Sequence, residues 1–573
     1  MLSRRPIRRR AVPETALPAL AGLPPVLARL YAARGVREAA ELDVALAGLA
    51  PVGSLDGVEA AAALVARHVA RGDRILVVGD FDADGATSTA LLVRALRALG
   101  GQPGYLVPDR QVHGYGLSPA LVREAAKREP ALLITVDSGI NCHPGVALAR
   151  ELGMEVLVTD HHLPGEHLPP ATAIVNPALP GQGFPSRCLA GVGVAFYLAA
   201  ALARQLGADR GLAAGLLDLV ALGTVADLVP LDRNNRILVE HGLRRIRAGA
   251  CRPGITALLR AGKRDPRETV TSDLAFAAGP RLNAAGRLDD MSVGIECLLS
   301  DDAEHAGELA ALLSNLNEDR KKIEARMQQE ALQAIEGLVP GANPDALPPV
   351  LCVHRPGWHS GVVGLVAARL KERYHRPVVA FAKDGNGSLK GSARSVPGLH
   401  IRDALADLDA RNPGLVERFG GHAMAAGLSL AGDRLEAFRE AIGEAVAARL
   451  EPGALDGALV SDGELEEDAM CLATAELLRD AAPWGQGFPE PLFDGVFELL
   501  DARVVGADHL KLRLRTAGGR RVMDGIAFRQ ADRLGAARPR RLRLAYRLGV
   551  NDYAGVRSAQ LLVEYLETVA DPE

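Results

Sequence analysis

Three aspartates, each two residues from the next, are the most distinctive chemical feature of this 573-residue sequence. Asp80, Asp82 and Asp84 follow the apolar segment 75–78 and lead into Gly85 and a helical pattern of small residues. Ionised carboxylates at the end of a buried strand need a partner, because burial destabilises an isolated charge. Hard divalent cations bind carboxylate oxygens readily, so the spacing predicts a metal site. The simpler alternative is a polar turn between a strand and a helix.

Further acidic and imidazole side chains follow other apolar segments. These segments lead to Asp137, to Asp160 with His161 and His162, and to Asp227. Ligands bind at the carboxyl ends of strands in open parallel α/β sheets, so the recurrence favours one shared site over separate polar turns. Carboxylates with one or two imidazoles favour Mn²⁺ or Mg²⁺ over a thiolate-rich zinc site.

The composition is that of a globular chain with enough apolar residues for several cores. Hydrophobic residues make up 48% and charged residues 24%, with a formal net charge of -4. This charge argues against a uniformly basic nucleic-acid binder, but basic residues concentrate in segments 4–10, 320–322 and 503–547. In the last segment, Arg and Leu alternate, which fits DNA contact and the solvated face of a sheet equally well.

Cysteine usage and apolar run lengths indicate a cytoplasmic protein. The six cysteines are scattered without a CxxC pair, so neither a disulfide framework nor a zinc ribbon is expected. No apolar run approaches the length of about 20 residues that crosses a bilayer. The basic start of the chain is not followed by a signal-peptide pattern.

Strand-like and helical patterns divide the chain into an N-terminal arm, two α/β parts, a connector and a barrel. Segment 1–50 predicts an irregular helical arm, and 51–300 alternates strands and helices as in a parallel α/β domain. A charged helix over 301–338 joins it to a second α/β lobe over 345–450. Segment 454–573 has the short alternating strands of a small antiparallel barrel. Because the apolar seam of the helix is short, we expect a connector in a monomer and not a coiled-coil dimer.

The motifs GDFDADG, VDSG, TDHH and ADLVP, in this order, resemble the four metal-binding motifs of the DHH phosphoesterase superfamily. The stretches PDRQVHGYGL, GPRLNAAGRLDD, WHSGVVGLVAARL, KGSARS and FGGHAMAAG are similar to those of its single-strand-specific exonucleases. The resemblance covers nearly the whole chain. It implies a DHH catalytic domain over 51–300, a DHHA1 domain over 345–450 and an OB-fold over 454–573.

The resemblance also implies a site for two divalent cations, Mn²⁺ or Mg²⁺. The implied metal ligands are Asp80, Asp82, Asp84, Asp137, His161 and Asp227. Asp80 and Asp82 would ligate the first cation, and the second would be ligated by Asp84, His161 and Asp227. Asp137 would bridge the two cations, because a carboxylate can offer one oxygen to each ion. The implied catalytic residues are Asp137, His162, which would face the scissile phosphate, and Asp160, which would orient a neighbouring imidazole.

Substrate contacts implied by the resemblance lie outside this cluster. They are Arg110, Tyr115, Arg281, Asn283, Arg287, Ser392, Arg394, Gly421 and His422. Arg110, Ser392 and Arg394 would form a 5′-phosphate pocket, since a planar guanidinium binds phosphate bidentately. Tyr115 would stack on a base, although a plain surface turn is the alternative for its segment.

The function implied is a single-strand-specific 5′→3′ DNA exonuclease that hydrolyses phosphodiester bonds with two metals and releases 5′-mononucleotides. Expected roles are recombination, mismatch repair and base-excision repair, with single-strand-binding protein and a RecQ-type helicase as partners. One alternative is a phosphoesterase for short oligonucleotides or cyclic dinucleotides, which would need only the two lobes. The other is a non-catalytic single-strand DNA-binding scaffold, against which the intact acidic motifs argue.

Overall fold

The computed structural model describes residues 5–109, 112–114, 116–209, 211–338, 347–384, 387–506, 508–534, 539–553 and 555–569. The chain forms two compact units. The N-terminal unit comprises Val12–Glu318 and Leu478–Glu490. The C-terminal unit comprises Met1–Ala11, Asp319–Leu477 and Pro491–Glu573.

The N-terminal unit is built on a five-stranded parallel sheet of order β3-β2-β4-β5-β6. Its strands are β2 (Arg74–Val78), β3 (Gln102–Leu106), β4 (Leu132–Val136), β5 (Glu155–Thr159) and β6 (Ala173–Val175). The three central strands β2, β4 and β5 are almost entirely buried. Burial on both faces explains why their sequences are continuous apolar runs and not alternating ones.

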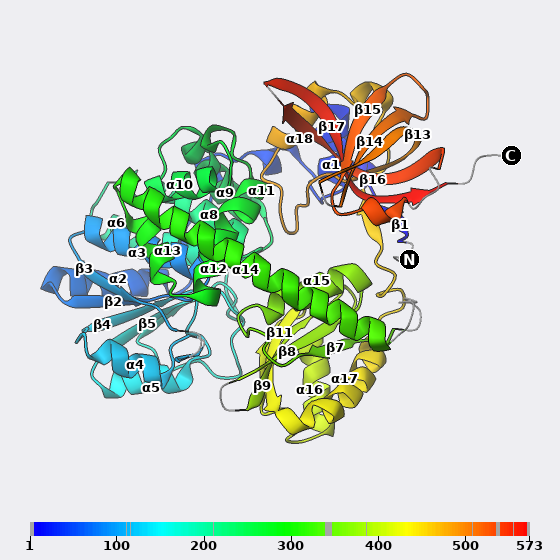
Figure 1. Cartoon of the computed structure of the whole chain (residues 1–573). Helices are drawn as coiled ribbons and strands as arrows, with labels where there is room; N and C mark the ends of the chain where they lie inside the picture. The colour runs from blue at the N-terminus through cyan, green and yellow to red at the C-terminus, as the bar shows by residue number, and fades with distance from the viewer. Residues whose placement is uncertain are drawn as a thin grey trace. The chain divides into compact units, whose positions relative to one another are not determined.

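Helices cover both faces of this sheet (Figure 1). One face carries α4 (Pro119–Ala126) and α5 (His143–Glu151), which pack on Leu76 and Leu133. On the other face lie α2 (Val58–Arg71), α3 (Ala83–Ala98) and α6 (Gly191–Gln205), and α6 packs against both α2 and α3. This arrangement leaves the carboxyl ends of the strands as the place where loops carry functional side chains.

A helical subdomain and an N-terminal arm complete the unit. The subdomain contains α7 (Gly211–Ala214), α8 (Leu217–Ala226), α9 (Arg233–Arg247), α10 (Pro253–Ala261), η6 (Pro266–Glu268), α11 (Thr271–Asp273), the π-helical turn η7 (Leu274–Ala278), α12 (Gly279–Leu288) and α13 (Ser292–Leu299). The arm contains η1 (Glu14–Ala16), η2 (Pro18–Leu20), α1 (Pro25–Ala32), η3 (Ala39–Leu42), η4 (Leu46–Gly48) and η5 (Val52–Ser54). From Glu14 onward the arm is irregular and helical. The start of the predicted arm is not, because it contains the strand β1 (Ile7–Arg9) and belongs to the C-terminal unit.

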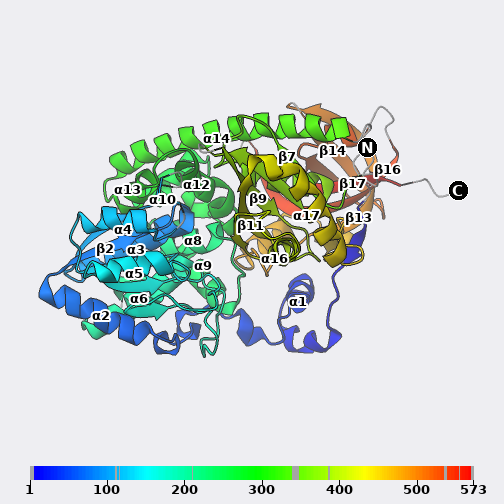
Figure 2. The same cartoon turned by 90° about the horizontal axis from the view of Figure 1, so that it is seen from below.

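The charged helix predicted to join the two lobes is α14 (Ala303–Leu338), a single helix of 36 residues (Figure 2). It begins in the N-terminal unit and ends in the C-terminal unit. Alternating acidic and basic residues on its surface form pairs such as Lys322 Nζ with Asp319 Oδ1 at 2.9 Å. Such pairs support a long exposed helix only modestly, by about 0.2–0.5 kcal/mol each.

The second α/β lobe lies in the C-terminal unit and has a mixed sheet of order β10-β11-β9-β8-β7. Its elements are β7 (Leu351–His354), α15 (Val363–Tyr374), β8 (Val378–Lys383), β9 (Ser388–Arg394), α16 (Ile401–Arg411), β10 (Arg418–Gly421), β11 (Ala425–Ala431), η9 (Gly432–Arg434) and α17 (Leu435–Arg449). Phe381 and Phe438 meet edge to face in its core, with ring centroids 5.4 Å apart. Among the described strands of this sheet, β7 and β8 pair in parallel and the other neighbours are antiparallel.

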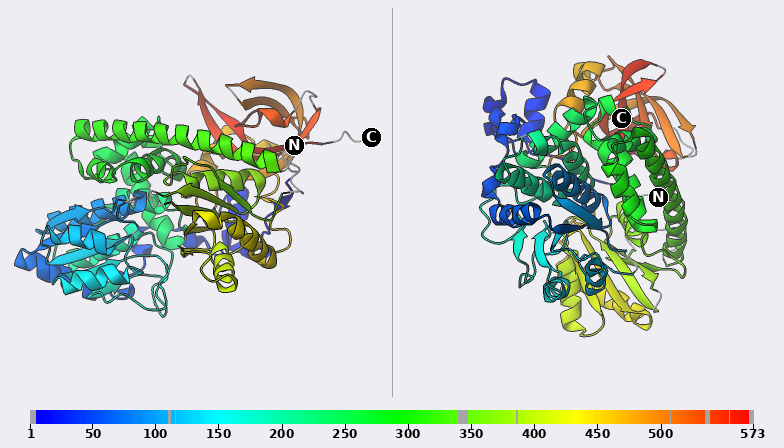
Figure 3. Two further views of the ribbon diagram at one scale, coloured as in Figure 1. Left: turned by 60° about the horizontal axis from the view of Figure 1, so that its bottom comes forward. Right: turned by 90° about the vertical axis from the view of Figure 1, so that its left-hand side faces the viewer.

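The predicted barrel is a closed one of order β13-β14-β15-β17-β16 (Figure 3). It is not wholly antiparallel as expected, because β15 and β17 pair in parallel. Its strands are β13 (Phe493–Val505), β14 (His509–Thr516), β15 (Val522–Ala527), β16 (Arg541–Tyr553) and β17 (Val556–Thr568). Between the lobe and the barrel come β12 (Leu459–Ser461), η10 (Glu467–Ala469) and α18 (Leu472–Asp480), and η11 (Ala531–Arg533) follows β15. β1 (Ile7–Arg9), from the start of the chain, pairs in parallel with β12.

Among the residues described, no single helix is long and apolar enough to cross a membrane. The helical segments Leu46–Ser54 and Val58–Arg71 together have the length and composition of a membrane span, but a bend of 78° separates them.

Candidate metal centre

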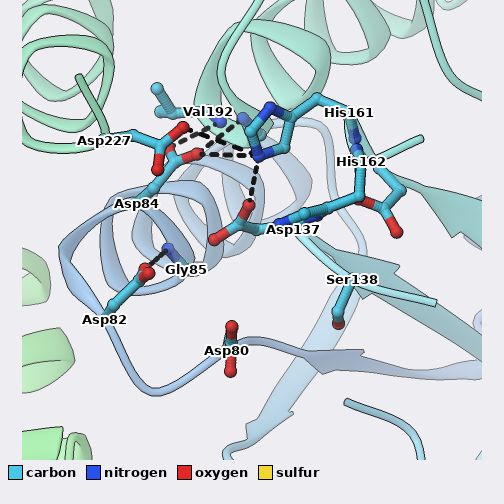
Figure 4. Close-up of polar contacts among 12 residues, drawn as sticks. Asp80, Asp82, Asp84, Gly85, Asp137, Ser138, His161, His162, Val192 and Asp227 are labelled. Carbon is cyan, nitrogen blue, oxygen red and sulfur yellow. Dashed lines mark hydrogen bonds and ion pairs between the residues drawn. The ribbon is translucent and has the colours of Figure 1, made fainter. Parts of the chain in front are cut away.

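Four chain segments bring the predicted acids and imidazoles together, at the ends of β2, β4, β5 and α8 (Figure 4). Three groups have ligand atoms within 4.8 Å of one another: Asp80 with Asp82 and Asp137, Asp84 with His161 and Asp227, and Asp137 with His161 and His162. Asp137 belongs to two of the groups and so lies between them. The third group also includes His162, which the sequence prediction places at the phosphate and not among the ligands.

The turn that carries the three aspartates of β2 is tight and held by hydrogen bonds. Asp82 caps α3, because its Oδ1 accepts from Gly85 N at 3.0 Å. A Cβ atom at Gly85 would lie 2.6 Å from Asp80 N, so only glycine fits there. Asn283 Oδ1 accepts from Ala83 N at 2.9 Å. Asn283, predicted as a substrate contact, therefore also fixes the backbone between two of the acids.

Asp84 belongs to the first turn of α3, and its carboxylate reaches the start of α6, where it accepts from Gly191 N at 2.6 Å and from Val192 N at 3.0 Å. A helix N-terminus favours negative charge. Burial and the neighbouring Asp82 nevertheless raise the pKa of Asp84 to about 7. Gly223 on α8 makes room for this carboxylate, since a Cβ there would lie 2.8 Å from Asp84 Oδ1.

Asp137 has a left-handed backbone with φ of 59°. A non-glycine residue rarely adopts this conformation, which persists where the surroundings impose it. Gly191 packs against it, because a Cβ at that position would lie 2.6 Å from Asp137 Cβ. Burial, and then the charges of Asp84 and Asp82, raise the pKa of Asp137 well above its ordinary value.

His161 lies among three carboxylates. Its Nε2 is 3.0 Å from Asp137 Oδ1, 3.6 Å from Asp227 Oδ2 and 4.0 Å from Asp84 Oδ2. Burial, followed by the charges of Asp84 and Asp82, also raises the pKa of Asp227 well above its usual value. One imidazole nitrogen facing three acids is the arrangement of a metal ligand.

Asp160 and His162 form a buried hydrogen-bonded pair beside this cluster. Asp160 Oδ1 is 2.7 Å from His162 Nδ1, and Asp160 also accepts from the backbone N–H groups of Ile140, His161 and His162. Burial alone would raise the pKa of Asp160, but the hydrogen bond and charge of His162 hold it below its ordinary value. Burial opposes the charge of His162 too, yet Asp160 raises the pKa of that imidazole to about 9. Asp160 thus fixes the orientation of His162.

The donor set fits hard divalent cations. Burial and mutual repulsion raise the pKa values of Asp84, Asp137 and Asp227. These carboxylates therefore cannot all be ionised without a compensating positive charge. Oxygen ligands with one or two imidazoles suit Mn²⁺ or Mg²⁺, and no cysteine belongs to any of the three groups formed by the described residues.

The predicted substrate contacts of α12 differ in their surroundings. Arg281 is only 8% exposed, and its guanidinium donates to Ala277 O at 2.7 Å, Ala261 O at 2.9 Å and Ser314 Oγ at 3.2 Å. These contacts favour a positioning role for Arg281, and its predicted phosphate contact stays a prediction. Arg287 is partly exposed at the end of the same helix.

The predicted contacts of the second lobe gather on adjacent strands of the C-terminal unit. Arg394 on β9 donates to Ser392 Oγ at 3.0 Å, and these two residues pair with Ala425 and Gly427 on β11. Gly421 ends β10, and His422 N donates to Ala425 O at 2.8 Å in the turn that follows. Arg110 and Tyr115, by contrast, lie outside the described residues.

The sequence did not predict the groups on α6 and α8 that contact the carboxylate of Asp84. The backbone N–H groups of Gly191 and Val192 and the space left by Gly223 are essential to the position of Asp84. The available signal was the run AGVGVAF, in which small residues begin an apolar helix. Such a pattern is typical of close backbone approach, but it does not say to what.

Family models match three parts of the chain: the DHH family N-terminal domain over residues 74–224, the DHHA1 domain over 348–448 and the RecJ OB domain over 461–565. Together with the parallel sheet and its acidic edge, these matches place the chain in the DHH phosphoesterase superfamily, as its motifs predict.

Full-length relatives narrow the class. The chain is 55% identical to a single-stranded-DNA-specific exonuclease RecJ of Dickeya dadantii, over 98% of each chain. It is 54% identical to the RecJ of Escherichia coli, over 97% of this chain and 98% of the relative. A crystal structure of RecJ from Thermus thermophilus in complex with Mn²⁺ superposes with a TM-score of 0.81 at 32% identity, covering 99% of this chain and 80% of that one. A second structure of the Thermus protein is a complex with Mg²⁺. The chain belongs to the RecJ family.

Proposed function

We propose that this chain is a metal-dependent exonuclease that degrades single-stranded DNA by hydrolysing phosphodiester bonds. The observation that carries the proposal is the convergence of Asp80, Asp82, Asp84, Asp137, His161 and Asp227 at one sheet edge. Membership of the RecJ family, whose curated relatives are single-stranded-DNA-specific exonucleases, supplies the substrate class.

The side chains of the sheet edge hold the metals in this proposal. Asp80 and Asp82 would ligate one ion, Asp84, His161 and Asp227 the other, and Asp137 would bridge both. Mn²⁺ or Mg²⁺ bound there would supply an activated water and positive charge for the oxygens of the scissile phosphate. The hydrogen bonds from Gly191 and Val192 keep Asp84 in place without help from the metal.

His162 is the residue that we assign to the phosphate or the leaving oxygen. Its Nδ1 lies 2.7 Å from Asp160 Oδ1, and one of its ring nitrogens lies within 4.8 Å of ligand atoms of Asp137 and His161. Asp160 also raises the pKa of this imidazole, which favours its protonated form. His162 can therefore stabilise negative charge, or transfer a proton to the leaving oxygen.

End recognition falls to the second lobe. We propose that Ser392 and Arg394, with Gly421 and His422 of the neighbouring hairpin, bind a terminal 5′-phosphate. The resemblance implies the same role for Arg110, which lies outside the described residues. An arginine beside a hydroxyl on one strand is suited to bidentate phosphate binding. A pocket for the 5′ end gives 5′→3′ polarity and release of 5′-mononucleotides.

The cellular setting proposed follows from the resemblance. It is a cytoplasmic, monomeric enzyme of recombination, mismatch repair and base-excision repair that works with single-strand-binding protein and a RecQ-type helicase. Sedimentation velocity of the pure protein, alone and with each partner, tests both the monomer and the two associations.

The first experiment is a time course on single strands labelled at either end, with Mn²⁺ or Mg²⁺, beside matched duplex and dinucleotide. We expect immediate release of 5′-mononucleotide from the 5′ label, with the duplex spared, and no release by the Asp137→Asn variant. Cleavage of the dinucleotide alone would transfer the protein to the small-substrate branch. Tight strand binding without hydrolysis would identify a scaffold.

A further inference from the structure

Residues 478–490, called the strap below, belong to a different compact unit from the residues on either side of them in the chain. The strap belongs to the N-terminal unit, whereas the residues immediately before and after it belong to the C-terminal unit. None of the predicted site residues lies in it. Its sequence, LRDAAPWGQGFPE, contains one of the two tryptophans of the chain.

Aromatic side chains anchor the strap. Trp484 and Phe488 are 7% and 2% exposed, and their rings stack with centroids 5.3 Å apart. Tyr31 of α1 stacks on both, at 6.0 Å from Trp484 and 6.1 Å from Phe488. Arg34 covers the Trp484 ring at 5.2 Å, and Arg236 of α9 covers the Phe488 ring at 4.3 Å. Such stacks add energy and fix orientation beyond area burial.

Hydrogen bonds fix the strap backbone to the same unit. Tyr31 Oη donates to Ala481 O at 2.7 Å, and Arg34 Nε donates to Pro489 O at 2.7 Å. Thr271 Oγ1, at the start of α11, donates to Trp484 O at 2.6 Å. The strap is therefore held along its length and not at a single contact.

The middle of the strap packs on the chain just after Asp227. Leu231 N donates to Gln486 O at 2.7 Å, and Leu231 is 4% exposed. A Cβ at Gly487 would lie 3.2 Å from Pro230 Cβ, and one at Gly485 would lie 2.6 Å from Leu231 Cδ1. These glycines let the strap backbone approach the loop 227–231 closely.

That loop contains a strained residue. Leu228 has φ of 61° and is 66% exposed. A left-handed backbone is unfavourable for a residue that has a side chain, and it persists only where the surroundings impose it. Pro230 O is bound from the other side by Asn235 Nδ2 at 2.9 Å. The strap therefore holds the end of the loop together with Asn235 and with Arg236, whose Nη1 donates to Leu231 O at 3.1 Å.

We infer that the strap is a positioning element of the metal centre: through Pro230 and Leu231 it holds Asp227 where a metal ion can bind it. Trp484 and Phe488 are positioning residues in this role, and Asp227 is the ligand on which they act. The inference deepens the proposed function and rests on Asp227 being a metal ligand.

The test is the Mn²⁺ affinity of the full-length protein, measured by calorimetry without DNA. Trp484→Ala should raise the Kd for Mn²⁺ about 10–100-fold, the range for loss of groups that orient metal ligands. Trp484→Phe keeps a stacking ring and should bind Mn²⁺ nearly as the parent does. Trp358→Ala is the matched control, because Trp358 is 5% exposed and lies in the C-terminal unit, so its loss should leave the Kd unchanged.

Folding of each variant is checked by far-ultraviolet circular dichroism. A milder pair of variants tests the inference if the Trp484→Ala chain does not fold. Tyr31→Phe removes only the hydrogen bond to Ala481 and should change the Kd little, whereas Arg34→Ala removes both a hydrogen bond and a ring contact and should raise it several-fold. A folded Trp484→Ala or Arg34→Ala protein with unchanged Mn²⁺ affinity overturns the inference.

Asp227→Asn separates this inference from the proposed function. Weaker Mn²⁺ binding by Asp227→Asn, with normal binding by Trp484→Ala, would contradict only the positioning role of the strap. Normal Mn²⁺ binding by Asp227→Asn would contradict the proposal that Asp227 is a metal ligand.

Discussion

At the scale of single residues, the metal centre is a set of mutually repelling acids held by groups without charge. Burial and neighbouring carboxylates raise the pKa values of Asp84, Asp137 and Asp227. Two backbone N–H groups and two glycines at close approach determine where these acids lie. Glycine is thus as necessary to the site as aspartate, because any side chain would occupy the space of a ligand.

The substitution Gly191→Ala tests this necessity. Its new Cβ would lie 2.6 Å from Asp137 Cβ and 2.8 Å from Asp137 Oδ1, so the carboxylate must move. We expect a loss of at least about tenfold in Mn²⁺ affinity and a comparable loss of nuclease activity, since a tenfold change corresponds to only about 1.4 kcal/mol. Gly307→Ala on α14, where nothing lies within 4 Å, is the control and should change neither. Equal Mn²⁺ affinities in the two variants would contradict the argument.

At the scale of elements, the short strand β1 from the start of the chain supplies a charged contact to the barrel. Arg9 on β1 donates to Asp494 at 3.1 and 3.0 Å, and Asp494 is 1% exposed at the start of the barrel. Burial would raise the pKa of Asp494, but Arg9 and Ser461 hold it below its usual value. Arg9 of β1 therefore neutralises a buried carboxylate of the barrel, together with Arg543, whose Nη2 lies 3.5 Å from Asp494 Oδ2.

Arg9→Ala should accordingly destabilise the C-terminal unit. A hydrogen bond to a charged group contributes about 1.5–3 kcal/mol, and we expect a loss in that range. Arg8→Ala is the matched control, because Arg8 meets Asp456 at 3.4 Å with both side chains exposed, which should cost less than about 1 kcal/mol. Urea unfolding followed by circular dichroism compares the two, and similar midpoints would refute the role of β1.

His375, which follows α15, predicts a pH dependence for the same unit. Burial, and then Arg5, Lys371, Arg376 and Arg533, lower its pKa from 6.5 to about 4. The unfolded chain binds a proton below pH 6.5 and the folded chain does not, so stability is complete above that pH and falls toward pH 4.

Unfolding free energies at about pH 7 and pH 5 should therefore differ by about 1–2 kcal/mol from this residue, at about 1.4 kcal/mol per pH unit. The variant His375→Asn should show a smaller difference, because asparagine does not titrate and tolerates the left-handed φ of 50°. Parallel pH profiles for the two proteins would exclude His375 as the source.

At the scale of the whole molecule, each unit is assembled from segments that are far apart in the sequence. The N-terminal unit takes the strap from beyond residue 477, and the C-terminal unit takes the first 11 residues. Contacts of this kind have high sequence separation, so both units depend on the full chain for their final packing.

Metal binding should stabilise the N-terminal unit selectively. At a free Mn²⁺ concentration of about 100 times Kd, linkage predicts a gain of about 2.7 kcal/mol. Asp137→Asn should abolish the gain, and should also make the metal-free unit more stable by removing one of the repelling charges. Scanning calorimetry with Mn²⁺ and with chelator measures both, and an undiminished gain in the variant would show that Asp137 is not a ligand.

Much of this protein could be predicted from its sequence alone. The apolar strands β2, β4 and β5, the acids that follow them and the order of the four motifs identified the fold class, the superfamily and the metal cluster. These features are local: a buried parallel strand is a continuous apolar run, and its carboxyl end is the next residue. The long helix and the alternating strands of the barrel were visible for the same reason.

Other features were decided only by the tertiary structure. Asn283 bonds to Ala83 across 200 residues, Arg281 is buried among carbonyl groups, and Gln486 of the strap bonds to Leu231 in the loop after Asp227. No periodicity in the sequence encodes such contacts, because a hydrogen bond or ring stack between distant segments requires only one residue on each side. The residues that we propose as metal ligands could therefore be predicted from the sequence, whereas the groups that hold them in place could not.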